Sequence, residues 1–176
     1  MKSKIQNTED KTSLMGLPRE QLSEALNILD IPEKQKNMRL NQVWGWLYNK
    51  GSKSIDEMTT LSLDLRRELE DHFDLSRPKI SEDQISKDGT RKWLLKFKDG
   101  SEVETVFIPD NDRGTLCVSS QVGCTLNCTF CHTGTQKLVR NLTAQEIVAQ
   151  VVVAKDCLQE WNPEPRQITN IVMMGM

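Results

Sequence analysis

The chain contains the stretch Thr115-Leu-Cys-Val-Ser-Ser-Gln-Val-Gly-Cys-Thr-Leu-Asn-Cys-Thr-Phe-Cys131, in which an apolar segment leads directly into a group of cysteines. Residues 115–119 predict a β-strand, and the run after them predicts a loop at its C-terminal end. The loop carries Cys124, Cys128 and Cys131 at C-x3-C-x2-C spacing, which supplies three thiolates and no evident fourth ligand. Such thiolates can hold an iron–sulfur cluster, and three cysteines keep one iron open to a small molecule.

A βαβ unit is predicted around this loop. Thr143-Ala-Gln-Glu146 has the form of a capping box and starts a helical pattern that continues to Leu158. The apolar run Ile168–Met174 then predicts a second strand, so residues 113–176 form strand, loop, helix and strand. Parallel strands are apolar on both faces and need further elements to cover them. Because the chain ends at Met176, we expect it to be a fragment that lacks those neighbours.

Residues 1–76 predict a small helical domain. Helical periodicity covers residues 18–31, residues 33–50 and the segment after the capping box Ser54-Ile-Asp-Glu57. Near Arg77-Pro78 the period changes to strand-like alternation, so residues 77–112 predict a β-hairpin linker with its turn at Lys98-Asp-Gly100. A turn-rich link is predicted at Pro109–Gly114. The expected fold class is α/β, with a helical domain, a hairpin and one βαβ unit.

The composition narrows the function classes without selecting one. The chain has 23 Lys+Arg against 25 Asp+Glu, so its net charge of -2 shows no global bias towards nucleic acid or a membrane. No stretch has the length and apolarity needed to cross a bilayer, which predicts a cytoplasmic protein with no membrane partner. Five cysteines are an odd number, and three of them crowd into eight positions. That pattern suits a metal site in a reducing compartment better than a disulfide framework.

Three other readings of the cysteine loop remain open from spacing alone. A structural zinc site would use the three cysteines and His132, although adjacent Cys131 and His132 would struggle to reach one tetrahedron. Cys128-Thr-Phe-Cys131-His132 also satisfies the C-x-x-C-H pattern of haem attachment, but no export signal supports it. A redox dithiol of Cys128 and Cys131 would leave Cys124 without a role.

The cysteine spacing, with the aromatic Phe130 before the last cysteine, resembles the signature of radical S-adenosylmethionine enzymes. Four further strings resemble the RlmN/Cfr family of RNA adenine methyltransferases: Val103-Glu-Thr-Val-Phe-Ile-Pro109, Thr115-Leu-Cys-Val-Ser-Ser-Gln-Val-Gly-Cys124, Arg140-Asn-Leu142 and Ile168-Thr-Asn-Ile-Val-Met-Met-Gly-Met176. The resemblance is weak in the helical domain and strong from about Gly89 onward. It implies that residues 113–176 are the start of a radical S-adenosylmethionine (β/α) barrel.

The same resemblance implies a chemistry. Cys124, Cys128 and Cys131 would hold a [4Fe-4S] cluster whose free iron binds S-adenosylmethionine. One molecule of this cofactor methylates a cysteine in the C-terminal part of such enzymes, and a second generates the radical that activates the methyl group. The carbon is then added to position 2 of adenine in 23S rRNA and tRNA. The implied partners are these RNAs and an electron donor such as a flavodoxin-type reductant, and the implied state is a monomer.

The resemblance also assigns roles to single residues. Glu104 matches the family's proton acceptor, and Cys117 matches the cysteine that resolves a protein–RNA adduct through a transient disulfide. Without the resemblance, a glutamate on a hairpin is usually a solvated residue, and a strand cysteine is usually a buried one. Gly175 and Met176 adjoin the position where the family has a Gly-Glu-Pro segment that grips the cofactor.

The family's methyl-carrying cysteine also lies beyond Met176, so we expect these 176 residues alone to be unable to complete methyl transfer. Cys157 is expected to be an inert buried thiol. Lys137 and Arg140 are candidates for phosphate contacts, although basic residues are more often simply solvated. The rival hypothesis is a non-catalytic zinc- or cluster-binding module that interacts with RNA.

Overall fold

The computed structural model describes residues 11–124, 136–161 and 166–173, and the chain divides into two compact units, Met1–Ser76 and Arg77–Met176. Unit 1 contains the predicted helices, and unit 2 contains the predicted strands and the helix before the C-terminal segment. Among the described residues, no helix combines the length and apolarity that a membrane span requires.

Unit 1 is built from the helices α1 (Arg19–Leu26), α2 (Glu33–Tyr48) and α3 (Leu63–His72). Their apolar faces form its core, which includes the buried side chains of Leu22, Leu26, Leu40, Val43, Leu47, Leu65 and Leu69. A short parallel pair, β1 (Thr12–Ser13) with β2 (Phe73–Asp74), joins the segment before α1 to the end of α3. Strands of two residues have no readable alternation, so the sequence did not predict this pair.

The predicted capping box at Ser54–Glu57 is wrong. These residues form a 3-10 turn, η1 (Ile55–Glu57), in which Ser54 makes no capping hydrogen bond. Ile55, Met58 and Leu61 are buried at a spacing of three, which matches the period of a 3-10 turn. The helix begins later, at Leu63, where the Ser62 hydroxyl accepts a hydrogen bond from the Leu65 amide at 3.4 Å.

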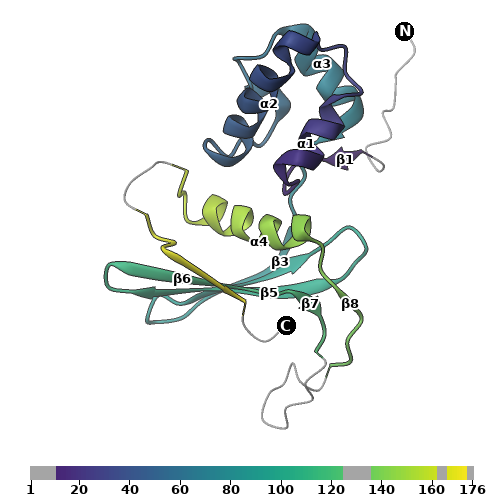
Figure 1. Ribbon diagram of the computed structural model, residues 1–176. Helices are drawn as coiled ribbons and strands as arrows, with labels where there is room; N and C mark the ends of the chain where they lie inside the picture. The colour runs from purple at the N-terminus through teal and green to yellow at the C-terminus, as the bar shows by residue number, and fades with distance from the viewer. Residues whose placement is uncertain (1–10, 125–135, 162–165, 174–176) are drawn as a thin grey trace, which may run out of the picture. The chain divides into compact units, whose positions relative to one another are not determined.

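Unit 2 is an α/β fold built on a five-stranded sheet with the order β3-β4-β5-β6-β9 (Figure 1). The strands β3 (Lys79–Ile85), β4 (Arg91–Lys96), β5 (Glu102–Asp110) and β6 (Arg113–Val118) form an antiparallel meander. The last strand, β9 (Asn170–Met173), pairs parallel with β6. The predicted hairpin and βαβ unit are both present, and they share this one sheet.

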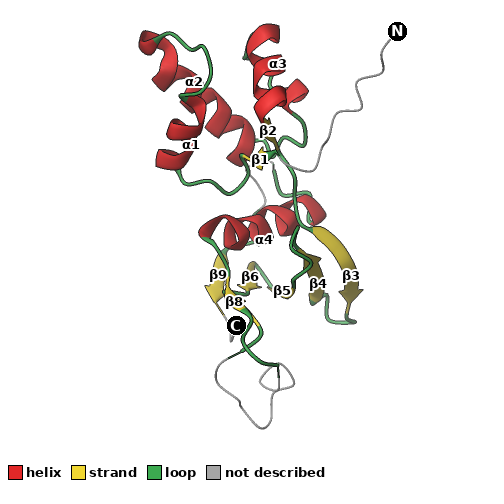
Figure 2. Cartoon of the chain, turned by 90° about the vertical axis from the view of Figure 1, so that its right-hand side faces the viewer, coloured by secondary structure: helices red, strands yellow, loops and turns green. Residues whose placement is uncertain are grey.

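Helix α4 (Ala144–Cys157) connects β6 to β9 and covers one face of the sheet (Figures 1 and 2). Its predicted capping box is confirmed, because Thr143 and Glu146 exchange both side-chain to backbone hydrogen bonds. The sheet face under α4 is apolar and packs against the buried Val153 and Ala154 of the helix. The buried sheet residues of this core are Trp93, Leu95, Val103, Phe107, Leu116 and Val118.

Three details of unit 2 differ from the prediction. The link at Pro109–Gly114 is tighter than expected, because β5 extends to Asp110 and pairs it with Arg113 across a two-residue turn. Strand β9 was expected to be buried, but Ile171 and Met173 are 50% and 65% exposed, since β9 is the edge of the described sheet. Cys157 is half-buried rather than buried, because it lies in the last position of α4.

Gly114→Ala is expected to destabilise unit 2 by about 2 kcal/mol. An added Cβ would lie 2.0 Å from the carbonyl oxygen of Gln167 and 2.5 Å from the Phe107 ring. Native-state hydrogen exchange in unit 2 would measure the loss. The control is Gly45→Ala in α2, where the nearest atom would be 4.0 Å away. That change should stabilise unit 1 by roughly 0.5–1 kcal/mol, and equal effects of the two changes would contradict the close packing at Gly114.

Candidate functional site

Glu104 and Cys117 lie on the same face of the sheet, opposite to α4. Val106 is the register partner of Cys117, and Glu104 is two residues from Val106 along β5. Side chains two residues apart on a strand point to the same face, and diagonal neighbours across a strand pair lie roughly 7–8 Å apart. Thr105 instead points to the face under α4, where its hydroxyl donates a hydrogen bond to Gln150 of the helix. We call the face that carries Glu104 and Cys117 the distal face.

Glu104 is paired with a cation on the distal face. Lys92 of β4 donates a hydrogen bond from Nζ to Glu104 Oε1 at 2.9 Å, and both side chains are about 40% exposed. The backbone of Glu104 is held as well, because the Ser119 hydroxyl donates to its carbonyl oxygen at 2.7 Å. The carboxylate is therefore oriented by its surroundings and still accessible to a reactant.

Cys117 is a buried thiol in the middle of the sheet. It lies in β6, between Val106 of β5 and Val172 of β9, and is 8% exposed. Burial raises the pKa of the Cys117 thiol, because the desolvated thiolate is disfavoured. The neutral thiol is the dominant form in the folded chain near neutral pH.

A short stem holds the base of the cysteine loop. Strand β7 (Gln121–Val122) pairs antiparallel with β8 (Arg140–Asn141), and the two lie side by side at one end of the main sheet (Figure 1). The Cys124 amide donates to the Gln136 carbonyl at 3.2 Å, and the Val139 amide donates to the Val122 carbonyl at 2.8 Å. We call residues 120–124 and 136–142 the loop stem.

Gly123 allows the two sides of the stem to approach closely. Its φ of +78° is in the left-handed region, and a Cβ there would lie 2.1 Å from the Lys137 carbonyl oxygen. Only glycine avoids both the conformational strain and this clash. The residue before Cys124 is therefore constrained, and the Cys124 side chain is buried at the base of the loop, with 6% exposure.

The other two predicted cluster ligands, Cys128 and Cys131, lie outside the described residues, as do His132, Gly175 and Met176. Within the described ranges, no group of three or more His, Cys, Asp or Glu side chains could hold a metal ion. Of the predicted site residues, the structure thus brings Glu104 and Cys117 together, and it places Cys124 two residues after β7.

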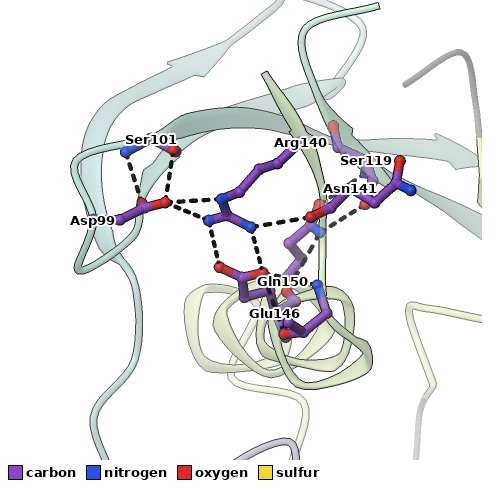
Figure 3. A network of polar contacts seen from close by, with 8 residues as sticks. Asp99, Ser101, Ser119, Arg140, Asn141, Glu146 and Gln150 are labelled. Carbon is purple, nitrogen blue, oxygen red and sulfur yellow. Dashed lines mark hydrogen bonds and ion pairs between the residues drawn. The ribbon is translucent and has the colours of Figure 1, made fainter. Parts of the chain in front are cut away.

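A buried glutamine of α4 fixes the end of β6 where the chain leaves for the loop (Figure 3). Gln150 Oε1 accepts from the Ser119 amide at 2.8 Å and from the Thr105 hydroxyl at 3.0 Å. Gln150 Nε2 donates to the Ser119 carbonyl at 2.9 Å. The Gln150 side chain is fully buried, so these bonds are the reason that its amide is tolerated in an apolar core.

An ion-pair network holds the returning side of the stem (Figure 3). Arg140 of β8 forms two hydrogen bonds with the carboxylate of Glu146, at 2.9 and 2.7 Å. It also donates to Asp99 Oδ2 at 2.8 Å, in the turn between β4 and β5. Burial alone would raise the pKa of Glu146, but the hydrogen bonds from Arg140 and Thr143 outweigh it and leave that pKa below its usual range. Two carboxylates thus offset the charge of Arg140, which was a candidate for a phosphate contact.

The first comparison with known proteins identifies the N-terminal part of the chain. Residues 12–75 match the family model described as "Ribosomal RNA large subunit methyltransferase N-terminal domain". Over 94% of its length, the chain is 55% identical to the "Dual-specificity RNA methyltransferase RlmN" of Nitrobacter winogradskyi and 56% identical to that of a Bradyrhizobium strain. The chain is therefore similar to RlmN proteins over most of its length.

The similarity to RlmN proteins extends to a solved structure. A radical SAM methyltransferase from Sphaerobacter thermophilus superposes with a TM-score of 0.79 and 40% sequence identity, over 94% of this chain and 47% of that one. The chain spans about 45% of the length of the Nitrobacter relative. Both units therefore have counterparts in that structure.

The sequence patterns did not predict the contacts of Lys92 and Gln150. Lys92 could have been found by counting outward from the hairpin turn, which brings it to the Val106 position, diagonal to Glu104. Gln150 could have been found because it is a polar residue within the apolar run Ile147–Ala154, four residues after the capping Glu146. A polar side chain on the apolar face of a helix indicates a buried hydrogen-bond partner.

The thiol of Cys117 should titrate above the ordinary range of cysteine. The rate of alkylation by iodoacetamide follows the thiolate fraction, so its pH midpoint reports the pKa. Because burial raises the pKa in the folded chain, Cys117 should react slowly at neutral pH and gain reactivity only in more alkaline solution. Peptide mass spectrometry of alkylated samples would measure it. The same thiol in urea is the control, and a folded midpoint at or below the unfolded one would contradict the assignment.

Proposed function

We propose that the protein is a radical S-adenosylmethionine methyltransferase that modifies carbon 2 of adenine in 23S rRNA and tRNA, and that this chain carries its cluster-binding loop. The relatives are named dual-specificity RNA methyltransferases, and the solved neighbour is named a radical SAM methyltransferase. The observation that carries the proposal is the C-x3-C-x2-C spacing after strand β6, in a chain that is 55% identical to an RlmN protein.

Cys124, Cys128 and Cys131 are the proposed ligands of a [4Fe-4S] cluster. The donor set fits, because thiolates are the usual cluster ligands and three of them leave one iron for S-adenosylmethionine. Cys124 supports the fit further, since its buried side chain follows the constrained Gly123 and its amide is bonded across the stem. When bound, such a cluster supplies the electron that activates the cofactor. These residues would bind it and hold it at the end of the sheet.

Glu104 and Cys117 are the proposed reactive side chains of this protein. Glu104 would accept a proton at its carboxylate, which Lys92 holds at 2.9 Å and which is partly exposed. Cys117 would lose its proton and attack the sulfur of the methyl-carrying cysteine in the C-terminal part of the protein. A transient disulfide would form as the bond from that sulfur to the RNA-bound carbon breaks, with its electron pair left on the RNA. Burial raises the pKa of the Cys117 thiol and so favours its protonated form before that step. Both lie on the distal face, so one reactant could meet both.

The proposed partners follow from this chemistry. The substrates would be rRNA and tRNA, as the relatives' names indicate. An electron donor such as a flavodoxin-type reductant would reduce the cluster. We also propose a monomer that acts in the cytoplasm, because a reducing compartment keeps the three loop thiols available as ligands.

Anaerobic reconstitution with iron and sulfide should produce a brown protein whose broad absorption bleaches on reduction. Cys124→Ala, Cys128→Ala and Cys131→Ala should each abolish most of the bound iron, because each removes one of three thiolate ligands. Iron content and the visible spectrum would measure the loss. Cys157→Ala is the matched control and should keep the wild-type spectrum, since Cys157 is at the far end of α4. A colourless wild-type chain that binds zinc tightly would favour the rival RNA-interaction module.

Transfer of labelled methyl groups from S-adenosylmethionine to RNA tests the reaction itself. We expect no transfer by these residues alone and measurable transfer by a fusion to the remaining part of the Nitrobacter relative. In the fusion, Glu104→Gln should lower the rate roughly a hundredfold or more, because the amide cannot accept the proton. Cys117→Ala should leave RNA attached to the protein.

The control variant in this assay is Glu102→Gln. Glu102 is also in β5 and faces the same side as Glu104, but it pairs with the exposed Lys96. Its replacement should leave the rate within about twofold, as for an exposed surface ion pair. An equal loss of methyl-transfer rate in both variants would contradict the proposed role of Glu104.

A further inference from the structure

The two ends of the cysteine loop are bonded to one helix at positions one turn apart. Glu146 and Gln150 of α4 are four residues apart and therefore lie on neighbouring turns of the same helical face. Gln150 is bonded to the end of β6, where the chain leaves for the loop, and Glu146 is bonded to β8, where the chain returns (Figure 3). The first two turns of α4 thus contact Ser119, the residue just before the stem, and Arg140 on its returning side.

Within the described residues, the stem is a short two-stranded ribbon. Each of its strands has two residues. The backbone bonds beyond the strand pair join Cys124 to Gln136, Val139 to Val122, and Leu142 to Ser120. A two-stranded ribbon is marginal in water without tertiary support. The stem therefore depends on the elements to which it is attached.

The attachment on the leaving side is buried and specific. Gln150 pairs with both the amide and the carbonyl of Ser119, so the peptide groups around Ser119 cannot shift along the helix without losing two bonds. Ser119 in turn bonds to the Glu104 carbonyl. Loss of the Gln150 amide would leave these buried groups unpaired, which is costlier than losing an exposed bond.

The attachment on the returning side is ionic. Arg140 lies between Glu146 of α4 and Asp99 of the β4–β5 turn, with hydrogen bonds to both carboxylates. Charge-assisted bidentate contacts of this kind combine strength with a defined orientation. Glu146 also belongs to the capping box of α4. The start of the helix and the returning strand are therefore fixed to each other.

We propose that Glu146 and Gln150 are positioning residues that set the separation of the two ends of the cysteine loop and so the place of Cys124. They touch no reacting atom and act through Arg140 and Ser119. The consequence for cluster binding rests on the function proposed above, whereas the consequence for the stem does not.

Amide hydrogen exchange in the stem tests the proposal on the chain without cluster. Gln150→Met keeps an unbranched side chain of similar length but removes all its hydrogen bonds. The amides of Cys124, Val139 and Leu142 should exchange roughly tenfold faster or more. Glu146→Gln keeps the capping pattern and weakens the bond to Arg140, so a rise of roughly fivefold is expected.

The matched control is Val153→Ala, which removes buried apolar volume from α4 but no hydrogen-bonding group. It should speed exchange across the core of unit 2 without a selective effect on the three stem amides. The two variants are compared at the same loss of global stability. If stem amides then exchange as fast in Val153→Ala as in Gln150→Met, the positioning role is overturned. If Gln150→Met does not fold, the stem exchange of Glu146→Gln is the deciding measurement. An unchanged exchange rate in that variant overturns the proposal.

A second readout follows the cluster. After reconstitution, chelator should remove iron from the Gln150→Met and Glu146→Gln variants several times faster than from the wild type and Val153→Ala. If both variants hold iron as long as the wild type does, the positioning role is overturned. If the wild-type chain takes up no cluster, the proposed function fails, and stem exchange alone decides the role of Glu146 and Gln150.

Discussion

The side-chain amide of Gln150 joins helix α4, strand β5 and the end of β6 at one buried point. It bonds to Ser119 at the end of β6 and to Thr105 of β5, within a core that is otherwise apolar. Apolar packing alone is non-directional and would tolerate small shifts of α4 along the sheet. The Gln150 amide does not tolerate such shifts, because a shift of α4 would leave buried polar groups without hydrogen-bond partners. The position of α4 and the direction in which β6 enters the stem are thus determined together.

The two faces of the sheet have different roles: one packs under α4 and forms the core, and the distal face carries the proposed reactive side chains. Alternate residues of β4, β5 and β6 point under α4 and form the core, as Trp93, Val103 and Leu116 do. The residues between them point to the distal face, and they include Glu104 and Cys117, the proposed reactive side chains. A change such as Glu104→Gln therefore alters a half-exposed ion pair and leaves the core packing intact. This separation allows a buried thiol and a carboxylate to lie near each other without a cost to the hydrophobic core.

The guanidinium of Arg140 is paired with carboxylates of the protein itself. The sequence suggests a phosphate contact for a basic residue after the cysteine loop, but two carboxylates from distant segments, Asp99 and Glu146, bind its guanidinium. Lys137 and Gly123 face each other across the stem at a distance that only glycine permits. These contacts make the stem a structural element that holds the two ends of the loop.

The sequence by itself determined the α/β class, the βαβ unit and the capping box at Thr143, because period and caps are local properties. The spacing of the three cysteines is likewise read from the sequence alone. It also pointed to Glu104 and Cys117, through resemblance. Only the tertiary structure decided that these two share the distal face, since that depends on strand register. It alone revealed Lys92 beside Glu104, the bonds of Gln150, and the start of α3 at Leu63 instead of at the capping box before it. These contacts join residues far apart in the chain, and the free energy that selects them comes from burial and pairing in the folded state.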